Sequence, residues 1–276
     1  MTTMTEPALA SPSNPRIKAA AGLRDRRERD ATGLTLVDGA RELRRALDAG
    51  VEVVEAFVCE PLLAGEDARA ALDALRARGV SLTTTTEAAF AKLAFGDRAE
   101  GLVAVIRSPS LAPDDLRLPA DPLIVVIEGV EKPGNVGAVL RSADGAGVDA
   151  VIAASPRTDL ANPNAIRASA GTIFTVPLAA APTGDVLRWL RDHDVRILAA
   201  RVDGALAYTD AVLTGPVAIA VGAEADGLTD AWRGPDIEAI HLPMLGVADS
   251  LNVSVTAAVL AYEARRQRGG RTAEAH

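Results

Sequence analysis

The stretch LIVVIEGVEKPGNVGAVLRSADGAGVDAVIAA, residues 123–154, contains a strand, a glycine-rich turn, a helix and a second strand in close succession. Leu123–Ile127 is an unbroken apolar run, which is typical of a strand buried on both faces of a sheet. The spacing of apolar residues predicts a helix over 135–145 and a second strand at Ala150–Ala153. Two such strands with a helix between them predict a parallel pair joined by a crossover helix.

The same alternation continues towards the C-terminus. Helices are predicted near 162–170, over 184–193 and over 251–267. The strands predicted between them are Thr172–Pro177, Val195–Ala200, Pro216–Val221 and Ala239–Leu242. Strands that alternate with helices predict an α/β domain whose mostly parallel sheet is covered by helices on both faces. We assign residues 123–268 to this domain and residues 269–276 to a short tail.

A smaller α/β domain is predicted upstream. Its expected strands are Leu34–Val37, Val51–Val58, Val80–Leu82 and Gly101–Arg107, and its expected helices span residues 40–47 and 67–78. We assign residues 14–107 to this domain. The Ser/Thr/Pro-rich residues 1–13 are expected to be a disordered tail, and the proline-marked stretch 108–122 is predicted to link the two domains.

Composition excludes several classes of protein. The net charge of −8 argues against a protein that coats nucleic acid through bulk electrostatics. The single cysteine, Cys59, and the absence of an apolar leader predict a cytoplasmic protein. No apolar run reaches the roughly 18 residues that a membrane span needs. With one cysteine and three scattered histidines, no metal site is expected.

A basic segment stands out against this acidic background. Six basic and two acidic residues lie between Asn14 and Arg29, which gives the segment a net charge of +4 (6 − 2). Such a segment forms either a solvated helix face or a local phosphate-binding surface. The candidate RNA-binding residues in it are Arg16, Lys18, Arg24, Arg26 and Arg27.

Three further segments place polar residues where chemistry could occur. In EGVEKPGNVGAVLRSADGAGV (128–148), Asn135 is positioned to cap the predicted helix, and Arg141 follows six residues later. This turn lacks the G-x-G-x-x-G and G-K-[ST] patterns, which disfavours a dinucleotide turn or a P-loop. A glycine-rich turn with one surface arginine is the structural alternative.

The second segment, VAIAVGAEADGLTDAW (217–232), leads a buried strand directly into Gly222 and Glu224. Ligands of open α/β sheets bind outside the carboxyl ends of the strands, where Gly222 would allow close approach to the backbone. The third segment, HLPMLGVADSLNVSVTAAVLAYEARR (241–266), places Ser250 and Asn252 at the start of the last helix. Both residues are also ordinary helix-capping groups.

Together these segments resemble the SpoU/TrmH-type RNA ribose methyltransferases of the SPOUT superfamily. The resemblance rests on P-G-N-V-G-A-x-x-R-S at 133–142, G-x-E-x-x-G-L at 222–228 and L-P-M…S-L-N-V-S-V at 242–255. The upstream motifs N-P-x-x-K at 14–18 and G-x-T-L-V-x-G-A-R-E at 33–42 resemble the ribosomal-protein-like substrate-binding domain that many members carry.

The resemblance implies a parallel α/β sheet whose C-terminal segment threads a deep trefoil knot, and a homodimer with its sites at the interface. It implies that S-adenosylmethionine binds at Ala199, Ala200, Arg201, Gly222, Leu242, Met244, Leu251 and Val253. It also implies that Arg141 activates the ribose hydroxyl, but a guanidinium is almost never deprotonated in proteins, so we expect Arg141 to hold the target phosphate or ribose. Asn135, Glu224, Ser250 and Asn252 are expected to orient Arg141 and the ribose. One departure is Lys132, which stands where the family usually has asparagine.

The function implied is 2′-O-methylation of a ribose in structured RNA, with S-adenosylmethionine as the methyl donor. The two-domain layout favours 23S ribosomal RNA, and resistance to a ribosome-targeting antibiotic is a narrower interpretation. A transfer RNA methyltransferase and an inactive RNA-binding paralogue remain alternatives, although the intact Asn135, Arg141, Glu224 and Asn252 disfavour the inactive paralogue. A nucleotide-binding oxidoreductase is disfavoured by the missing glycine fingerprint.

Overall fold

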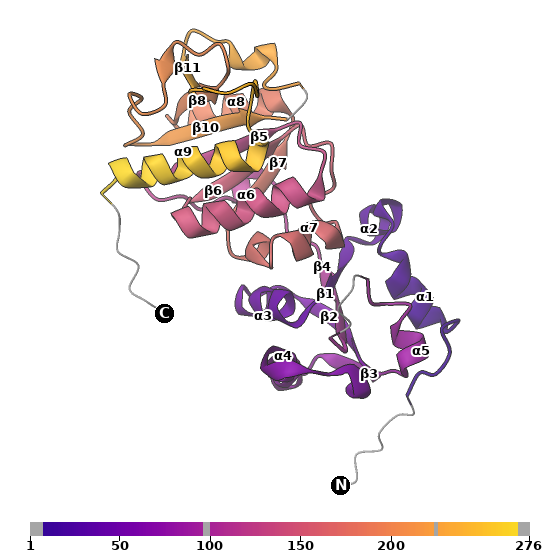
Figure 1. The fold of residues 1–276 in the computed structure, drawn as a ribbon. Helices are drawn as coiled ribbons and strands as arrows, with labels where there is room; N and C mark the ends of the chain where they lie inside the picture. Colours follow the sequence, from indigo (N-terminus) through magenta and orange to yellow (C-terminus); the bar gives the residue numbers. More distant parts are fainter. Residues whose placement is uncertain (1–7, 96–99, 224–225, 270–276) are drawn as a thin grey trace. The chain divides into compact units, whose positions relative to one another are not determined.

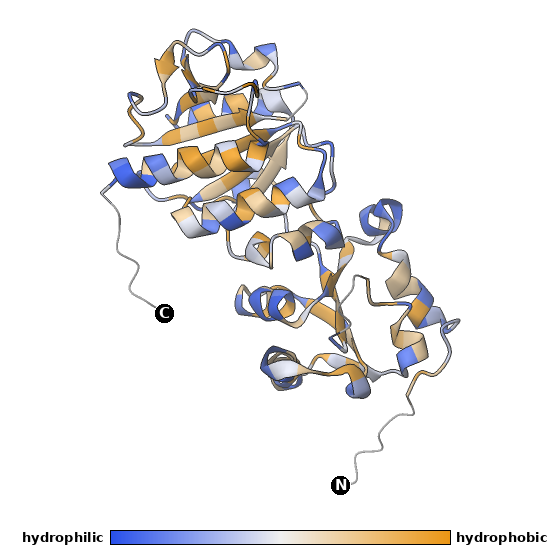
Figure 2. Ribbon diagram, in the orientation of Figure 1, coloured by the Kyte–Doolittle hydropathy of each residue, from blue (hydrophilic) through white to orange (hydrophobic). Residues whose placement is uncertain are grey.

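The chain forms two compact units in a computed structural model that describes residues 8–95, 100–223 and 226–269 (Figure 1). The first unit comprises Met1–Pro109 and Asp159–Thr175, and the second comprises Ser110–Thr158 and Val176–His276. In both units apolar residues concentrate on the strands, while the helices carry polar residues on part of their surface (Figure 2). Among the described residues, no helix is long and apolar enough to cross a bilayer.

The second unit is built on a seven-stranded sheet of order β7-β6-β5-β10-β8-β11-β9. Every pair of neighbouring strands in it is parallel. The strands are β5 (Leu123–Glu128), β6 (Ala150–Ala154), β7 (Leu178–Ala181), β8 (Arg196–Ala200), β9 (Leu206–Ala207), β10 (Val217–Gly222) and β11 (Ile237–His241). The predicted class, an α/β domain with a parallel sheet, is confirmed.

Helices cover the central strands of this sheet because those strands are apolar on both sides. All six residues of β5 are buried. Helix α8 (Thr183–Asp192) contributes Val186 and Leu190 to a core that includes Ile124 and Val126 of β5. Helices α6 (Pro133–Ala146) and α9 (Val253–Gln267) pack against each other (Figure 1).

The order of the strands reverses beside β5. From β5 the chain proceeds outward to β6 and β7, whereas β10 lies on the other side of β5. The register aligns Glu128 with Gly222 on one side and with Ala154 on the other, so these strands end at the same level. In open α/β sheets this switch point is where a crevice for ligands opens.

Two local expectations in this region are wrong. The N-cap of α6 is Lys132, followed by Pro133 in the first turn, so Asn135 lies inside the helix and does not cap it. Residues 172–174 form the 3-10 helix η3 (Thr172–Phe174), and the strand starts only at Leu178. The β-prone side chains of 172–177 are overruled because Gly171 adopts a left-handed backbone (φ 84°) and the Thr172 hydroxyl donates to the Ser169 carbonyl at 2.8 Å.

The first unit has a four-stranded sheet of order β1-β4-β2-β3. Its elements are β1 (Leu34–Asp38), β2 (Val53–Val58), β3 (Ser81–Thr84), β4 (Leu102–Arg107), α3 (Ala40–Asp48), α4 (Gly65–Ala77) and α5 (Glu87–Phe90). Helices α3 and α4 pack together over an apolar core. Leu9, in the segment expected to be a disordered tail, forms a parallel bridge with Thr85, whereas residues 1–7 lie outside the described part of the chain.

The basic segment forms two helices, α1 (Pro15–Gly22) and α2 (Arg26–Thr32). Helix α2 begins separately because the Asp25 side chain accepts a hydrogen bond from the Arg27 amide at 2.9 Å. One side of this segment is apolar and faces the core of the unit, since Ile17, Ala20 and Leu23 are buried.

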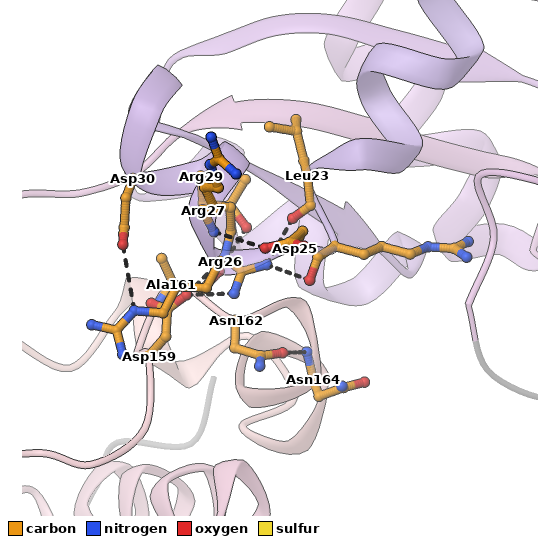
Figure 3. Close-up of polar contacts among 12 residues, drawn as sticks. Leu23, Asp25, Arg26, Arg27, Arg29, Asp30, Asp159, Ala161, Asn162 and Asn164 are labelled. Atoms are coloured by element: carbon orange, nitrogen blue, oxygen red, sulfur yellow. Dashed lines mark hydrogen bonds and ion pairs between the residues drawn. The ribbon is translucent and has the colours of Figure 1, made fainter.

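The segment Asp159–Thr175 lies in sequence between β6 and β7, within the range predicted for the second domain, yet it makes its contacts in the first unit. Arg29, only 4% exposed, donates through Nε to Asp159 at 2.8 Å (Figure 3). The Thr35 hydroxyl donates to the Ala161 carbonyl at 2.6 Å. Helix α7 (Pro163–Ala168) adds Ile166 to the apolar core of this unit.

Candidate functional site

A pocket of about 470 Å³ opens in the second unit at the carboxyl ends of three neighbouring strands, β8, β10 and β11. Its walls come from residues 200–203, 221–223, 226–228 and the segment 242–256, which are far apart in the sequence. Seven residues predicted to bind a cofactor line it: Ala200, Arg201, Gly222, Leu242, Met244, Leu251 and Val253. The eighth, Ala199, does not line it, because strand alternation turns its side chain into the core that contains α8.

The wall at Gly222 is a tight reversal of the chain. The Gly227 amide donates to the Ala223 carbonyl at 2.9 Å and closes the turn. A Cβ at position 222 would lie 2.0 Å from the Gly227 carbonyl carbon and 2.2 Å from the Leu228 nitrogen. A side chain at position 222 would therefore meet the backbone of this turn before it reached the space of the pocket. Glycine is required because the backbone of 227–228 passes directly over it.

Charged side chains line one part of the pocket. Arg201 Nε and Nη2 donate to the two carboxylate oxygens of Asp203 at 2.9 and 2.7 Å, and Arg233 Nη1 donates to the same carboxylate at 3.1 Å. The hydrogen bond from Arg201 lowers the pKa of Asp203, so this carboxylate stays ionised at neutral pH. Sequence reasoning missed Asp203 and Arg233 because an isolated V-D-G turn and an isolated arginine carry no motif.

Two more carboxylates, Asp226 and Asp249, line the same pocket. Asp226 is held by Arg157, which also pairs with Glu131 at 2.7 Å. The pocket therefore combines apolar walls, close-approaching backbone, two arginines and three carboxylates. Such a lining suits a ligand that has an apolar part and charged groups of both signs.

Two of the predicted catalytic residues are in contact. Asn252 is the N-cap of α9, and its Oδ1 accepts from the Ser254 amide at 2.9 Å and from the Ser254 hydroxyl at 2.6 Å. Its Nδ2 donates to Asn135 Oδ1 at 3.4 Å. This contact ties the start of α9 to the first turn of α6.

Two other predicted catalytic residues, Ser250 and Arg141, take no part in this contact. Ser250 lines the pocket. Arg141 is an exposed residue of α6, and no hydrogen bond or ion pair joins its side chain to any described residue. Glu224 lies outside the described residues.

The five predicted RNA-binding residues belong to the first unit, and their side chains differ in what they contact. Arg16 donates to Glu55 and Thr83 at 2.8 and 2.7 Å. Arg24 donates to the carbonyls of Leu93 and Ala94 at 2.7 and 2.6 Å and stacks over Phe95. These two arginines therefore hold the segment on its own unit.

Three basic residues remain closer to solvent. Arg26 forms only an exposed ion pair with Asp30 at 3.4 Å. Lys18 and Arg27 are exposed, and within the described part of the chain their side chains take part in no hydrogen bond or ion pair. These three are the residues of the segment that a phosphate backbone could still reach.

Comparison with known proteins accounts for both units. Residues 122–262 match the SpoU rRNA Methylase family, and residues 14–104 match the MRM3-like substrate binding domain. The 23S rRNA (uridine(2479)-2′-O)-methyltransferase of Streptomyces viridochromogenes is 31% identical over 261 residues, covering 91% of this chain and 89% of the relative.

Two solved structures are similar over nearly the whole chain. One is an RNA 2′-O ribose methyltransferase with 43% identity and a TM-score of 0.83, covering 95% of this chain and 99% of the other. The second is the AdoMet-bound rRNA methyltransferase of Sinorhizobium meliloti, with 26% identity and a TM-score of 0.84, covering 94% and 97%. The resemblance seen in the motifs is thus confirmed, and the chain belongs to the SpoU rRNA methylase family.

Proposed function

We propose that this protein transfers a methyl group from S-adenosylmethionine to the 2′-hydroxyl of a ribose in 23S ribosomal RNA. The observation that carries the proposal is the convergence of two of the three motif segments with residues 200–203 on one pocket beside the switch point of the sheet. Similar proteins named for 23S rRNA 2′-O-methylation, and a similar structure named as AdoMet-bound, support the same reading.

The pocket fits this cofactor in size and chemistry. Its volume of about 470 Å³ falls within the range of roughly 300–1,000 Å³ that small-molecule sites occupy. Leu242 and Leu251 offer apolar surface, and Asp226 and Asp249 offer negative charge. When bound, the cofactor supplies an electrophilic methyl group on a positively charged sulfur. Backbone groups of Gly222, Leu242 and Leu251 would hold it.

The remaining work falls to residues that bind and orient the RNA. A ribose hydroxyl must be aligned for in-line displacement, so positioning supplies much of the rate. Arg141 is permanently protonated, which suits it to hold the target phosphate or ribose and not to accept a proton. The contact between Asn135 and Asn252 fixes the start of α6. We assign Ser250 and Glu224 to orienting the ribose.

Binding of the RNA would involve the first unit, whose match is to a substrate-binding domain. Lys18, Arg26 and Arg27 are assigned to phosphate contacts, which position RNA without reading its sequence. A ribosomal RNA substrate places the protein in the cytoplasm. Resistance to a ribosome-targeting antibiotic is a narrower proposal, and identification of the methylated nucleotide would test it.

We also propose a homodimer, formed through the second unit. Val255 and Tyr262 lie seven residues apart on one face of α9 and are 45% and 53% exposed. Leu245 and Val247, in the loop before α9, are almost fully exposed. Exposed apolar residues grouped in this way mark an interface, and a second copy is the occupant the family resemblance implies. Light scattering on the purified protein tests this.

The experiment for the main proposal measures methyl incorporation from labelled S-adenosylmethionine into 23S rRNA and into bulk tRNA, alongside a calorimetric titration of the cofactor. Binding of the cofactor and label in 23S rRNA are expected. Label in tRNA alone would instead support the alternative that the protein is a transfer RNA methyltransferase. Binding of RNA without any transfer would favour an inactive paralogue.

A further inference from the structure

Glu128 ends β5 beside the switch point of the sheet and is only 3% exposed. Its carboxylate accepts three hydrogen bonds. Oε2 accepts from the Thr229 amide at 2.7 Å, and Oε1 accepts from the hydroxyls of Thr229 at 2.9 Å and Thr183 at 2.7 Å. All three donors are uncharged, and no cationic group among the described residues pairs with Glu128.

These bonds join segments that follow different strands. Thr229 follows β10 and ends the turn whose residues Gly227 and Leu228 wall the pocket. Thr183 follows β7 and begins α8. The Thr183 amide in turn donates to the hydroxyl of Ser155, the residue after β6, at 3.0 Å. Glu128 thus anchors one wall of the pocket to the ends of the neighbouring strands.

A buried carboxylate without a cationic partner is costly, and apolar side chains would fill this space at lower cost. Leu228 packs its side chain on the core, but that contact does not fix the backbone of the turn. The two hydrogen bonds from the Thr229 amide and hydroxyl to the Glu128 side chain do, at 2.7 and 2.9 Å, because together they fix the direction of the backbone at Thr229. Glu128 itself does not line the pocket.

We propose that Glu128 is a positioning residue for the cofactor: it sets the affinity for S-adenosylmethionine by fixing the backbone of residues 226–229 through Thr229. This inference rests on the proposed function. Because Glu128 acts on the wall of the cofactor pocket and on no RNA-binding residue, its loss should change cofactor affinity while leaving turnover at saturating cofactor nearly intact.

The test compares Glu128→Met, which has similar size but accepts no comparable bond, with Glu128→Gln. In Glu128→Gln the amide oxygen can accept from Thr229 N–H, and the amide NH₂ can donate to the two hydroxyls. We expect Glu128→Met to raise the Kd for S-adenosylmethionine about tenfold or more. We expect Glu128→Gln to stay within about threefold of the wild type. Hydrogen exchange should show faster exchange of the Thr229 amide in Glu128→Met only.

A second pair of variants acts on the partner. Thr229→Ser keeps both donors, whereas Thr229→Val loses the hydroxyl, so only the valine variant should weaken cofactor binding. The double variant Glu128→Met/Thr229→Val should bind no worse than Glu128→Met alone, because the hydroxyl bond that the valine removes is already lost in Glu128→Met. Steady-state assays on 23S rRNA should show a raised KM for the cofactor with kcat within about threefold.

An unchanged Kd in a folded Glu128→Met protein would overturn the inference and leave the proposed function standing. If Glu128→Met does not fold, equal cofactor affinities of Thr229→Ser and Thr229→Val would overturn it instead. A wild-type protein that does not bind S-adenosylmethionine at all would contradict the proposed function, which separates the two failures.

Discussion

Arg141 is the clearest case of a charged side chain that is available to bind another molecule. It is exposed on α6 and, within the described residues, its side chain forms no hydrogen bond or ion pair. Most other arginines of the second unit are paired, as Arg188 is with Asp185 at 2.8 Å. An arginine whose side chain has no internal partner, on the same helix as Asn135, is well suited to hold an anionic target.

We therefore expect Arg141→Ala to lower kcat on RNA by about 100-fold or more, since loss of a preorganised charge costs that order. The Kd for S-adenosylmethionine should stay nearly unchanged, because Arg141 does not line the pocket. Arg141→Lys should recover little activity if the fork of the guanidinium is what matters. Arg188→Ala is the matched control. Near-normal turnover of Arg141→Ala would remove this residue from the mechanism.

Asp38, in the first unit, gives a prediction about pH. Burial raises the pKa of this carboxyl to about 6, against hydrogen bonding by the Phe95 amide and the nearby charge of Arg167. Glu100 contributes to the rise, and Arg24 opposes it. Because the folded-state pKa lies above the unfolded value of 3.8, the folded state binds more protons between about pH 4 and 6. The free energy of unfolding therefore falls as pH rises through that window.

Asp38→Asn removes this titration. We expect the free energy of unfolding of Asp38→Asn, minus that of the wild type, to rise by about 2–3 kcal/mol between pH 4 and pH 7, since one pKa unit corresponds to about 1.4 kcal/mol. Urea unfolding of both proteins at pH 4, 5, 6 and 7 measures the difference. A difference that does not vary with pH would show that Asp38 does not titrate in this range.

At the scale of elements, the turn after β10 depends on one glycine. Any Cβ at position 222 meets the backbone of Gly227 and Leu228 at 2.0–2.2 Å. Gly222→Ala should therefore displace the turn, destabilise the fold by about 1–3 kcal/mol and abolish measurable cofactor binding. Gly184→Ala, at the start of α8 where a Cβ meets nothing within 4 Å, is the control and should behave as the wild type. Normal cofactor binding by Gly222→Ala would contradict this packing argument.

Helices α1 and α2 carry the prediction about RNA affinity. Lys18→Ala/Arg27→Ala should weaken RNA binding and reduce the salt dependence of the Kd by about two charges, since each phosphate contact contributes about one. Arg24→Ala is unsuitable for this purpose because Arg24 holds residues 93–95. If the dependence of the Kd for RNA on salt is unchanged in the double variant, the segment is a solvated helix face and does not contact the phosphates.

Periodicity was sufficient to predict most of the elements, and the reasons for its failures are local. The apolar run of β5 and the capping group of α9 were predicted correctly because each signal lies within a few residues. Residues 172–177 were predicted as a strand from β-prone side chains, yet Gly171 and the Ser169 hydroxyl bonds favour a 3-10 turn. Glu128 was not predicted because its partners Thr183 and Thr229 are distant in the sequence, and Asp203 was not predicted because the V-D-G turn that carries it belongs to no motif.

At the scale of the whole molecule, the chain passes between the two units three times, after Pro109, after Thr158 and after Thr175. Sequence patterns identify α7 but not the unit it joins, since burial of Ile166 against the first unit depends on contacts with residues far upstream. The pocket and Arg141 belong to the second unit, and Lys18 and Arg27 to the first. The trefoil knot and the homodimer implied by the resemblance stay predictions.

The central claim is the identity of the group that receives the methyl. The direct measurement is nucleoside analysis by mass spectrometry of unmodified 23S rRNA after incubation with the protein and S-adenosylmethionine. We expect one additional 2′-O-methylnucleoside per molecule of 23S rRNA with the wild-type protein and none with Arg141→Ala. Methylation on a base, or a 23S rRNA that gains no methyl group while the protein binds the cofactor, would contradict it.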